Sequence, residues 1–361
     1  MPEKLNVTKS FLPPLEEYQQ MVAEIWQSGQ LTNFGDKTKE LEKKLEEHLG
    51  VKHLQLVSNG TVALQLAIKA LNLKGQIITT PFSYVATVSS IVWEGCSPVF
   101  VDINHNDLCI DADLIEAAIT EKTSAILATH VYGHPCNTEK IKVLAEKYEL
   151  KVIYDAAHAF GVKKNGESIL NHGDISTLSF HATKIFQTAE GGAVITNNNQ
   201  LDKRLRSHGN FGHSGQEAFD GLGINSKTSE LHAAMGLCVL PQMEKIIAAR
   251  KKAVLLYNSL LADSTLIGFT PQPNVTHNYS YCPVLFPSEK LLLKTQTELN
   301  ANNIFPRRYF YPSLDRLPYV KNERPLPVGH DISERVMCLP LSAEISEDNI
   351  GLVCRIILNN L

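Results

Sequence analysis

The sequence has no apolar run long enough to cross a membrane and no excess of positive charge. No stretch reaches the roughly 18 consecutive apolar residues of a transmembrane helix, and the N-terminal segment MPEKLNVTKS lacks the apolar core of a signal peptide. There are 34 Lys and Arg against 38 Asp and Glu, which gives no electrostatic footprint for nucleic acid or an anionic membrane. We therefore expect no nucleic-acid or membrane partner, and a cytoplasmic location.

Cysteine pairs and the common nucleotide-binding glycine motifs are also missing. The seven cysteines are odd in number and none is in a CxxC spacing, which favours reduced thiols over a disulfide framework. His130, His134 and Cys136 lie close in sequence, but their spacing fits no standard structural zinc pattern, so no metal is expected. No P-loop and no GxGxxG occurs, so any phosphate group must be bound by residues outside these two common motifs.

The chain instead contains a regular alternation of strand-like and helix-like segments. Its 361 residues and 43% hydrophobic content are sufficient for a large core, and the length suggests two or three domains. Helix-like stretches cover residues 36–49, 62–71, 85–93, 111–119 and 138–148. Strand-like runs cover residues 54–57, 76–80, 98–101, 124–129, 151–155, 175–180 and 193–196. The alternation predicts an α/β domain with a mostly parallel sheet that is covered on both faces.

The pattern changes after about residue 235. Residues 241–261, 288–302 and 347–358 are predicted helices, the last with Ser346 as its N-cap, and residues 279–286 alternate like a half-buried strand. The stretch 303–342 is rich in Pro, Tyr and Arg and is expected to be ordered loop. We predict a large α/β domain over residues 1–238 and a smaller α+β domain over residues 239–361.

Two residues at strand ends, Lys184 and Asp155, suggest a chemistry. Residues 151–155 (KVIYD) end on the Asp155 carboxylate, and Lys184 follows the strand that ends at Phe180. This pair suits a pyridoxal 5′-phosphate (PLP) site, because a lysine can form a Schiff base with the cofactor while an acid pairs with its ring nitrogen. Apolar walls and a nearby cationic ring would let such a lysine lose its proton near neutral pH. Asp155 could instead be only a helix cap.

Three further segments could line this site. In Ser58-Asn59-Gly60-Thr61, free N–H groups at a helix start would bind an anion, although the same residues also suit an ordinary turn and cap. Tyr84 could stack on a flat ring, with Phe82 as second choice, but core packing is the competing interpretation. His158 could contact the cofactor or orient Asp155, or be a satisfied core residue.

Four motifs, taken together, resemble the DegT/DnrJ/StrS family of PLP-dependent nucleotide-sugar aminotransferases. The resemblance extends over nearly the whole chain and implies the aspartate aminotransferase fold, fold type I. It also implies PLP as cofactor, pyridoxamine 5′-phosphate as its intermediate form, and L-glutamate as amino donor. The motifs are SNGTxAL at 58–64, aromatic-x-A-T at 84–87, DxAxxxG at 155–161, and SFHxxK at 179–184 with GGxxxT at 191–196.

The resemblance also implies roles for individual residues. Lys184 and Asp155 would be catalytic, and His158 would contact the cofactor. The cofactor phosphate would be bound by three residues of this chain, Gly60, Thr61 and Ser179.

A fourth phosphate ligand would come from a neighbouring subunit. Asn225 lies in the segment GINSK, which matches the family's G-x-N-x-[RK] pattern except that Lys227 stands where arginine is usual. This implies a homodimer with shared active sites. Arg307, Arg308 and Tyr309 are candidates for binding the nucleotide diphosphate, and a surface role for either arginine stays open.

Residues 80–95 and 179–196 are most similar to family members that act on dTDP-4-dehydro-6-deoxyglucose. We therefore expect transamination of that sugar by L-glutamate, giving dTDP-4-amino-4,6-dideoxyglucose and 2-oxoglutarate for a cell-surface glycan such as the lipopolysaccharide O-antigen. Lys184, which some relatives replace by histidine, favours transamination over dehydration. A C3-aminotransferase, a UDP- or GDP-sugar aminotransferase, another fold type I enzyme such as a lyase, and a non-catalytic binding or regulatory protein of this fold remain alternatives.

Overall fold

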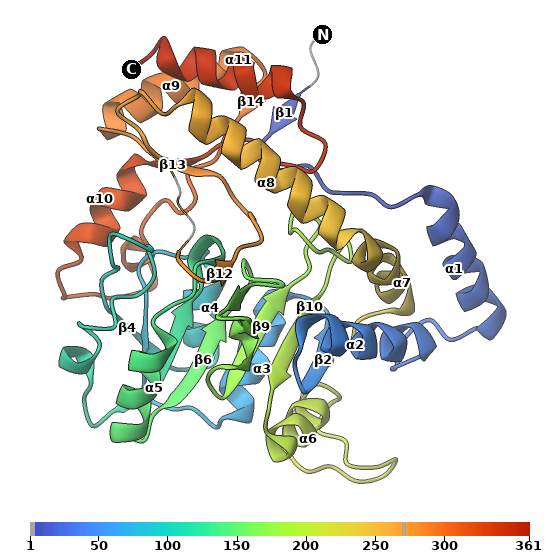
Figure 1. Ribbon diagram of the computed structural model, residues 1–361. Coiled ribbons are helices and arrows are strands. Elements are labelled where there is room, and N and C mark those ends of the chain that lie inside the picture. Colours follow the sequence, from blue (N-terminus) through green and yellow to red (C-terminus); the bar gives the residue numbers. More distant parts are fainter. Residues whose placement is uncertain (1–3, 269, 271) are drawn as a thin grey trace.

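A seven-stranded sheet forms the centre of the molecule in the computed structural model, which describes residues 4–268, 270 and 272–361 (Figure 1). The strand order is β2-β10-β9-β6-β5-β3-β4, and only β10 runs antiparallel to its neighbours. The predicted α/β fold with a mostly parallel sheet is confirmed. The strands are β2 (His53–Val57), β3 (Gln76–Thr79), β4 (Ser97–Phe100), β5 (Thr123–Thr129), β6 (Lys151–Asp155), β9 (Ile175–Ser179) and β10 (Gly192–Thr196).

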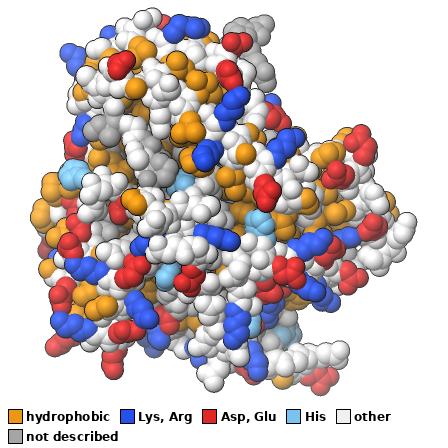
Figure 2. Space-filling view, viewed as in Figure 1, with side chains coloured by type: hydrophobic (Ala, Val, Ile, Leu, Met, Phe, Trp, Pro, Cys, Tyr) orange, Lys and Arg blue, Asp and Glu red, His pale blue; other side chains and the backbone are white. Residues whose placement is uncertain are grey.

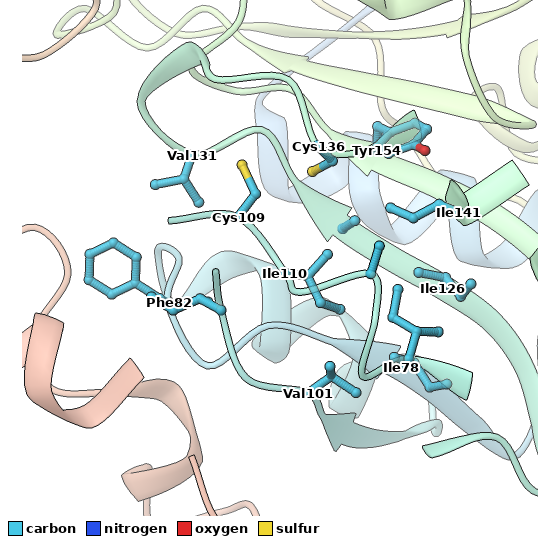
Figure 3. Close-up of a cluster of buried hydrophobic side chains, with 14 of the residues drawn as sticks. Ile78, Phe82, Val101, Cys109, Ile110, Ile126, Val131, Cys136, Ile141 and Tyr154 are labelled. Carbon is cyan, nitrogen blue, oxygen red and sulfur yellow. The ribbon is translucent and has the colours of Figure 1, made fainter. Parts of the chain in front are cut away.

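Helices cover both faces of this sheet. Successive strand residues point to opposite sides, so Tyr154 of β6 packs in one core cluster and Ile153 in another. Figure 3 shows the first cluster, where Ile78, Ile126 and Tyr154 from three adjacent strands meet Ile141. On that face lie α2 (Asp36–Leu49), α5 (Thr138–Lys147) and α7 (Glu230–Val239); on the other lie α3 (Gly60–Ala70), α4 (Ala86–Trp93) and α6 (Asn199–His208).

The C-terminal part has its own hydrophobic cluster. Three long helices, at the places predicted from the sequence, pack there against a three-stranded antiparallel sheet. The N-cap predicted at Ser346 is confirmed, since its hydroxyl accepts a hydrogen bond from the Asn349 N–H. The elements are α8 (Met243–Leu260), α9 (Glu289–Ala301), α11 (Glu347–Leu358), β11 (Ile267–Gly268), β13 (Pro283–Leu285) and β15 (Val336–Cys338).

The beginning of the described chain joins this C-terminal part. Strand β1 (Leu5–Asn6) pairs in parallel with β14 (Ile304–Phe305), so the first described strand lies beside the C-terminal part in the upper half of Figure 1. The helix α1 (Leu15–Ser28) then extends to α7. The shorter elements are β7 (Lys163–Lys164), β8 (Glu167–Ser168), β12 (Val275–Thr276), and the 3₁₀ turns at Val131–Gly133, Ile169–Asn171, Leu240–Gln242 and Leu314–Arg316.

Two of the segment assignments from sequence are wrong. Residues 111–119 form no α-helix but only a 3₁₀ turn, Glu116–Ala118, because the Asp111 carboxylate bonds the Asp113 N–H and turns the chain locally. Residues 279–286 form a strand only at Pro283–Leu285, since Tyr279 has a φ of 55° that a strand does not permit.

The stretch 303–342 is more regular than expected. Besides β14 and β15 it contains the helix α10 (Pro327–Arg335). The Asp102 carboxylate accepts hydrogen bonds from the N–H groups of Val328 and Gly329 at 2.9 and 2.7 Å, so α10 is capped by a residue far away in sequence.

Charged side chains of both signs are interspersed on the face shown in Figure 2. All seven cysteines are buried as free thiols. Among the described residues, no helix is long and apolar enough to cross a membrane. In the same residues, His, Cys, Asp and Glu form no group of three or more that could hold a metal ion.

Candidate active site

The predicted site residues gather at the edge of the sheet where the parallel strands end. A cavity of about 600 Å³ opens there, between the central sheet and the C-terminal part. Ligands of open α/β sheets bind at this edge, outside the carboxyl ends of the strands. The wall of the cavity includes Gly60, Thr61, Tyr84, Asp155, His158, Ser179, Lys184, Tyr281, Tyr309 and Phe310.

Asp155 ends β6 and is held by two hydrogen bonds. Its Oδ1 accepts from the Ala157 N–H at 3.2 Å, and its Oδ2 accepts from the Thr87 hydroxyl at 2.7 Å. The side chain is only 5% exposed. The Ala157 bond is a local turn contact of the kind that a cap makes, but the Thr87 bond and the cavity place the carboxylate at a ligand site as well.

Lys184 reaches the same cavity from the turn after β9. Its backbone N–H donates to the His181 carbonyl at 2.8 Å, and its Nζ donates to the Tyr281 hydroxyl at 3.2 Å. Burial lowers the pKa of the amine from 10.5 to about 8, against the opposing effect of the Asp155 charge. Both the neutral and the protonated amine are therefore populated near neutral pH.

His158 is a buried neutral base beside Asp155. Its Nδ1 accepts from the Tyr132 N–H at 3.3 Å, which leaves the proton on Nε2. Burial lowers the pKa of the imidazole well below its usual value. The ring stacks on Phe310 with centroids 5.4 Å apart and meets Tyr281 edge-on at 5.1 Å.

The start of α3 forms a recess suited to an anion. The Asn59 side chain accepts from the Val62 N–H at 2.9 Å, and the N–H groups of Gly60 and Thr61 precede the first bond inside the helix. A Cβ on Gly60 would lie 2.8 Å from the Ser179 Cβ, so only glycine lets the helix start approach β9 this closely. The positive end of the helix and the nearby hydroxyls fit a phosphate monoester.

Two aromatic candidates differ in position. Tyr84 lines the cavity and is 57% exposed. Phe82, the second choice from sequence, is fully buried and packs edge-on against Tyr132 with centroids 6.1 Å apart. The core-packing interpretation therefore holds for Phe82.

The three candidates for substrate binding, residues 307–309, also differ in whether they are free to bind a ligand. Tyr309 lines the main cavity, and Arg307 lines two adjoining cavities of about 400 and 500 Å³ that share Tyr309. Arg308 also lines the larger of these, but its guanidinium bonds Glu289 at 2.6 Å and lies 3.6 Å over the Tyr311 ring. Arg308 is thus largely occupied by contacts within the chain.

Asn225 is exposed and lies outside the part of the cavity wall that the described residues form. Its Oδ1 accepts from the Lys227 N–H at 3.3 Å. The next residue, Ser226, accepts from the Ser58 N–H at 2.7 Å, so the loop borders the recess at the start of α3. Lys227 itself donates to Asn210 at 3.0 Å.

Sequence reasoning missed Tyr281 and Phe310 and gave no role to Thr87. Tyr281 precedes β13 in a segment without any recognisable motif, and it meets Lys184 only through the fold. Thr87 is the threonine of the aromatic-x-A-T element, so that motif was the available signal for it. Lys163 and Lys164, the other lysines of the segment that follows Asp155, lie in β7 and do not line the cavity.

A lysine and an aspartate that face one cavity at the carboxyl edge of the sheet, beside a recess for phosphate, define a PLP-dependent transferase of fold type I. The particular family follows from comparison with known proteins. The chain belongs to the DegT/DnrJ/EryC1/StrS aminotransferase family, whose profile matches residues 15–358. It is therefore an enzyme, an aminotransferase with PLP as its cofactor.

Individual relatives are similar over almost their full length. A dTDP-4-amino-4,6-dideoxy-D-glucose transaminase of Shigella dysenteriae is 45% identical over 360 residues, which cover 96% of each chain. An enzyme of the same name from Escherichia coli is 39% identical and covers 99% of each chain. Among solved structures, DesI in the presence of its TDP-sugar product superposes with a TM-score of 0.96 at 29% identity, covering 100% of this chain and 94% of DesI.

Proposed function

We propose that this enzyme transfers the amino group of L-glutamate to C4 of dTDP-4-dehydro-6-deoxy-D-glucose, giving dTDP-4-amino-4,6-dideoxyglucose and 2-oxoglutarate. The choice of sugar is supported by the two relatives named as transaminases of this amino sugar and by the TDP-sugar product recorded with DesI. The observation that carries the chemistry is the Lys184 amine, which shares one cavity with the Asp155 carboxylate and has a lowered pKa.

The residues of the cavity fit the cofactor. Gly60, Thr61 and Ser179 would hold the phosphate, because the recess at the start of α3 would be filled by any Cβ at Gly60. Asp155 would pair with the ring nitrogen, and Lys184 would hold the cofactor covalently. Bound PLP supplies an electron sink for the negative charge left on carbon when a proton is removed. Tyr84 and His158 also line this space and would contact the ring.

Lys184 would then act as the proton carrier. Because its pKa is about 8, the amine accepts a proton readily and also returns one at neutral pH, as a general base followed by a general acid must. Asp155 remains in place during this transfer, since the Thr87 and Ala157 donors fix both of its oxygens. The neutral His158 adds no positive charge that would compete with the ring nitrogen for the Asp155 carboxylate.

We propose that the nucleotide diphosphate lies toward Arg307 and Tyr309. Both border the space that adjoins the main cavity, and a guanidinium suits a diphosphate. Arg308 would contribute less directly, because it is bound to Glu289.

We also propose a homodimer in which Asn225 completes the phosphate site of the neighbouring subunit. The support is that Asn225 is exposed and that its loop carries an unusual set of exposed apolar side chains. These are Phe211, Phe219, Leu222 and Ile224.

The domain division stays a proposal: a PLP-binding domain over residues 1–238 and a smaller domain over 239–361, with β1 crossing to the latter. We further propose that the enzyme acts in the cytoplasm, which suits seven free thiols. Its amino sugar would serve a cell-surface glycan such as the lipopolysaccharide O-antigen.

The test is direct. The purified protein should be yellow, and borohydride reduction followed by peptide mapping should place the cofactor on Lys184. Glutamate alone should bleach the colour and release 2-oxoglutarate. A panel of dTDP-, UDP- and GDP-linked keto sugars, with NMR of the product, should give a C4 amine on the dTDP sugar. A colourless Lys184→Arg variant that still transaminates would refute the role of Lys184, and a C3 amine would refute the regiochemistry.

A further inference from the structure

Tyr281 is the side chain whose polar group meets the Lys184 amine. Its hydroxyl lies 3.2 Å from the Lys184 Nζ and accepts a hydrogen bond from it. The same amine lies 5.8 Å from the centre of the Tyr281 ring, so the ring face also attracts the protonated form. Tyr281 is only 8% exposed, and it lines the cavity of the proposed active site.

The segment that carries Tyr281 is fixed from the side of the large sheet. The Asn278 side chain donates to the carbonyls of His158 and Phe160, both at 2.9 Å, and the Ser280 hydroxyl donates to the His158 carbonyl at 2.7 Å. The segment is therefore attached to the turn that begins at Asp155. Any displacement of Tyr281 relative to Asp155 would break several buried hydrogen bonds.

The same segment is fixed from the C-terminal part as well. Arg250 of α8 is almost fully buried, and it donates to the carbonyls of Tyr279 at 2.9 Å and Ser280 at 2.6 Å. Its third bond goes to the Leu341 carbonyl at 3.3 Å. All three of these acceptors are backbone carbonyls, and none is a carboxylate. The buried guanidinium therefore fixes the backbone of the segment that carries Tyr281.

The rings around Tyr281 complete its support. His158 meets it edge-on at 5.1 Å and Tyr309 at 5.7 Å. The hydroxyl is thus the one part of the side chain that is not needed for packing. Burial raises the pKa of this phenol, so the hydroxyl stays neutral and can accept a hydrogen bond from the lysine in either of its protonation states.

We propose that Tyr281 is a positioning residue for the proton-carrying amine: its hydroxyl holds Lys184 at the cavity wall whenever the amine is not bonded to the cofactor. This inference rests on the proposed function, because only an amine that is released from the cofactor and later bonds to it again needs to be held in position in between. No covalent step is assigned to Tyr281. It orients the lysine, and the lysine moves the proton.

The test is Tyr281→Phe, which keeps the ring contacts and removes only the hydroxyl. In the glutamate half-reaction we expect the rate constant to fall about tenfold, the equivalent of one hydrogen bond to a charged group, with the KM for glutamate unchanged. The matched control is Tyr257→Phe, which removes another buried hydroxyl, bonded to the Pro340 carbonyl at 3.0 Å; Tyr257 does not line the cavity. It should react like the wild type.

A second readout needs no activity. In the cofactor-free full chain, the pH dependence of Lys184 acetylation, followed by mass spectrometry, gives the pKa of the amine. Because the phenol accepts from the ammonium form, its removal should shift this pKa downward. The hydroxyl of 3-fluorotyrosine is a weaker hydrogen-bond acceptor than that of tyrosine. Its site-specific incorporation at position 281 should therefore give a Lys184 pKa between those of the wild type and Tyr281→Phe. This protein also provides a test if Tyr281→Phe does not fold.

The outcomes separate the two proposals. A wild-type protein without a borohydride-fixed cofactor would refute the proposed function, whatever Tyr281 does. The positioning role would be overturned if the wild type is functional and either Tyr281→Phe or the fluorinated protein has the same half-reaction rate constant and the same Lys184 pKa as the wild type. A raised KM with an unchanged rate constant would also overturn it, since that pattern would make Tyr281 a glutamate-binding residue.

Discussion

The Thr87 hydroxyl donates a 2.7 Å hydrogen bond to Asp155, and that bond fixes the direction of a whole chain of hydroxyl groups. Since Thr87 gives its only proton to the carboxylate, it must accept from Ser83 at 2.8 Å. Thr129 in turn donates to Ser83 at 3.0 Å. These three buried hydroxyls, from the end of β5, the turn after β3 and the helix α4, thus all direct their protons along the chain toward Asp155, and each bond strengthens the next.

Replacing Thr87 by valine should impair the enzyme although it preserves shape. A hydrogen bond to a charged group contributes about 1.5–3 kcal/mol, so the rate of the glutamate half-reaction should fall about tenfold or more. Thr87→Ser keeps the hydroxyl and is the matched control. Stopped-flow absorbance with both variants measures the effect, and equal rates for valine and serine would show that the hydroxyl does not matter.

The titration of Lys184 should be displaced from that of an ordinary lysine. Acetylation in the cofactor-free protein should have its midpoint near pH 8, against about 10.4 for an exposed lysine. The amine is protonated and unreactive below this midpoint and neutral above it. Asp155→Asn should move the midpoint lower still, because the carboxylate charge raises the lysine pKa. A midpoint above pH 10 would contradict the burial argument.

Gly60→Ala should weaken cofactor binding more than it weakens the fold. The new Cβ would lie 2.8 Å from the Ser179 Cβ, and the start of α3 would have to move away from β9. We expect the affinity for PLP, measured by equilibrium dialysis, to fall at least about tenfold, equivalent to roughly 1.4 kcal/mol. Gly351→Ala is the control, since its Cβ in α11 would meet no atom nearer than 3.7 Å. Equal affinities for the two variants would argue against the recess as the phosphate site.

Subunit mixing can decide whether Asn225 acts across an interface. Lys184→Ala and Asn225→Ala should each be impaired alone. If the asparagine serves the partner's site, a mixed dimer restores one intact site, and activity should recover to roughly a quarter of wild type for random mixing in equal amounts. If Asn225 serves the recess of its own chain, which its loop also borders, mixing restores nothing.

The sequence predicted the elements whose signal is local. The leucine spacing of α2 and the apolar run of β6 gave bounds that agree with the structure, because periodicity and burial coincide there. The strand-end positions of Asp155 and Lys184 also predicted that they would share one edge of the sheet, since parallel strands end together.

What the sequence could not predict depends on distant partners. The helix α10 begins where Asp102 caps it, and no local pattern at 327–335 reveals that partner. Tyr281 meets Lys184 only because Asn278, Ser280 and Arg250 fix its segment between two parts of the fold. Arg308 has the side chain of a diphosphate ligand, but its guanidinium donates to Glu289 of α9, a partner that no local sequence pattern predicts.

The pairing of β1 with β14 has a consequence for how the chain folds. The Leu5 N–H donates to the Asn303 carbonyl, and the Val7 carbonyl accepts from the Leu341 N–H, so both contacts join residues that are far apart in sequence. Contacts of such large sequence separation form slowly, because a long loop must be closed first. During synthesis the segment at residues 5–7 therefore stays unpaired until residues 303–341 have left the ribosome.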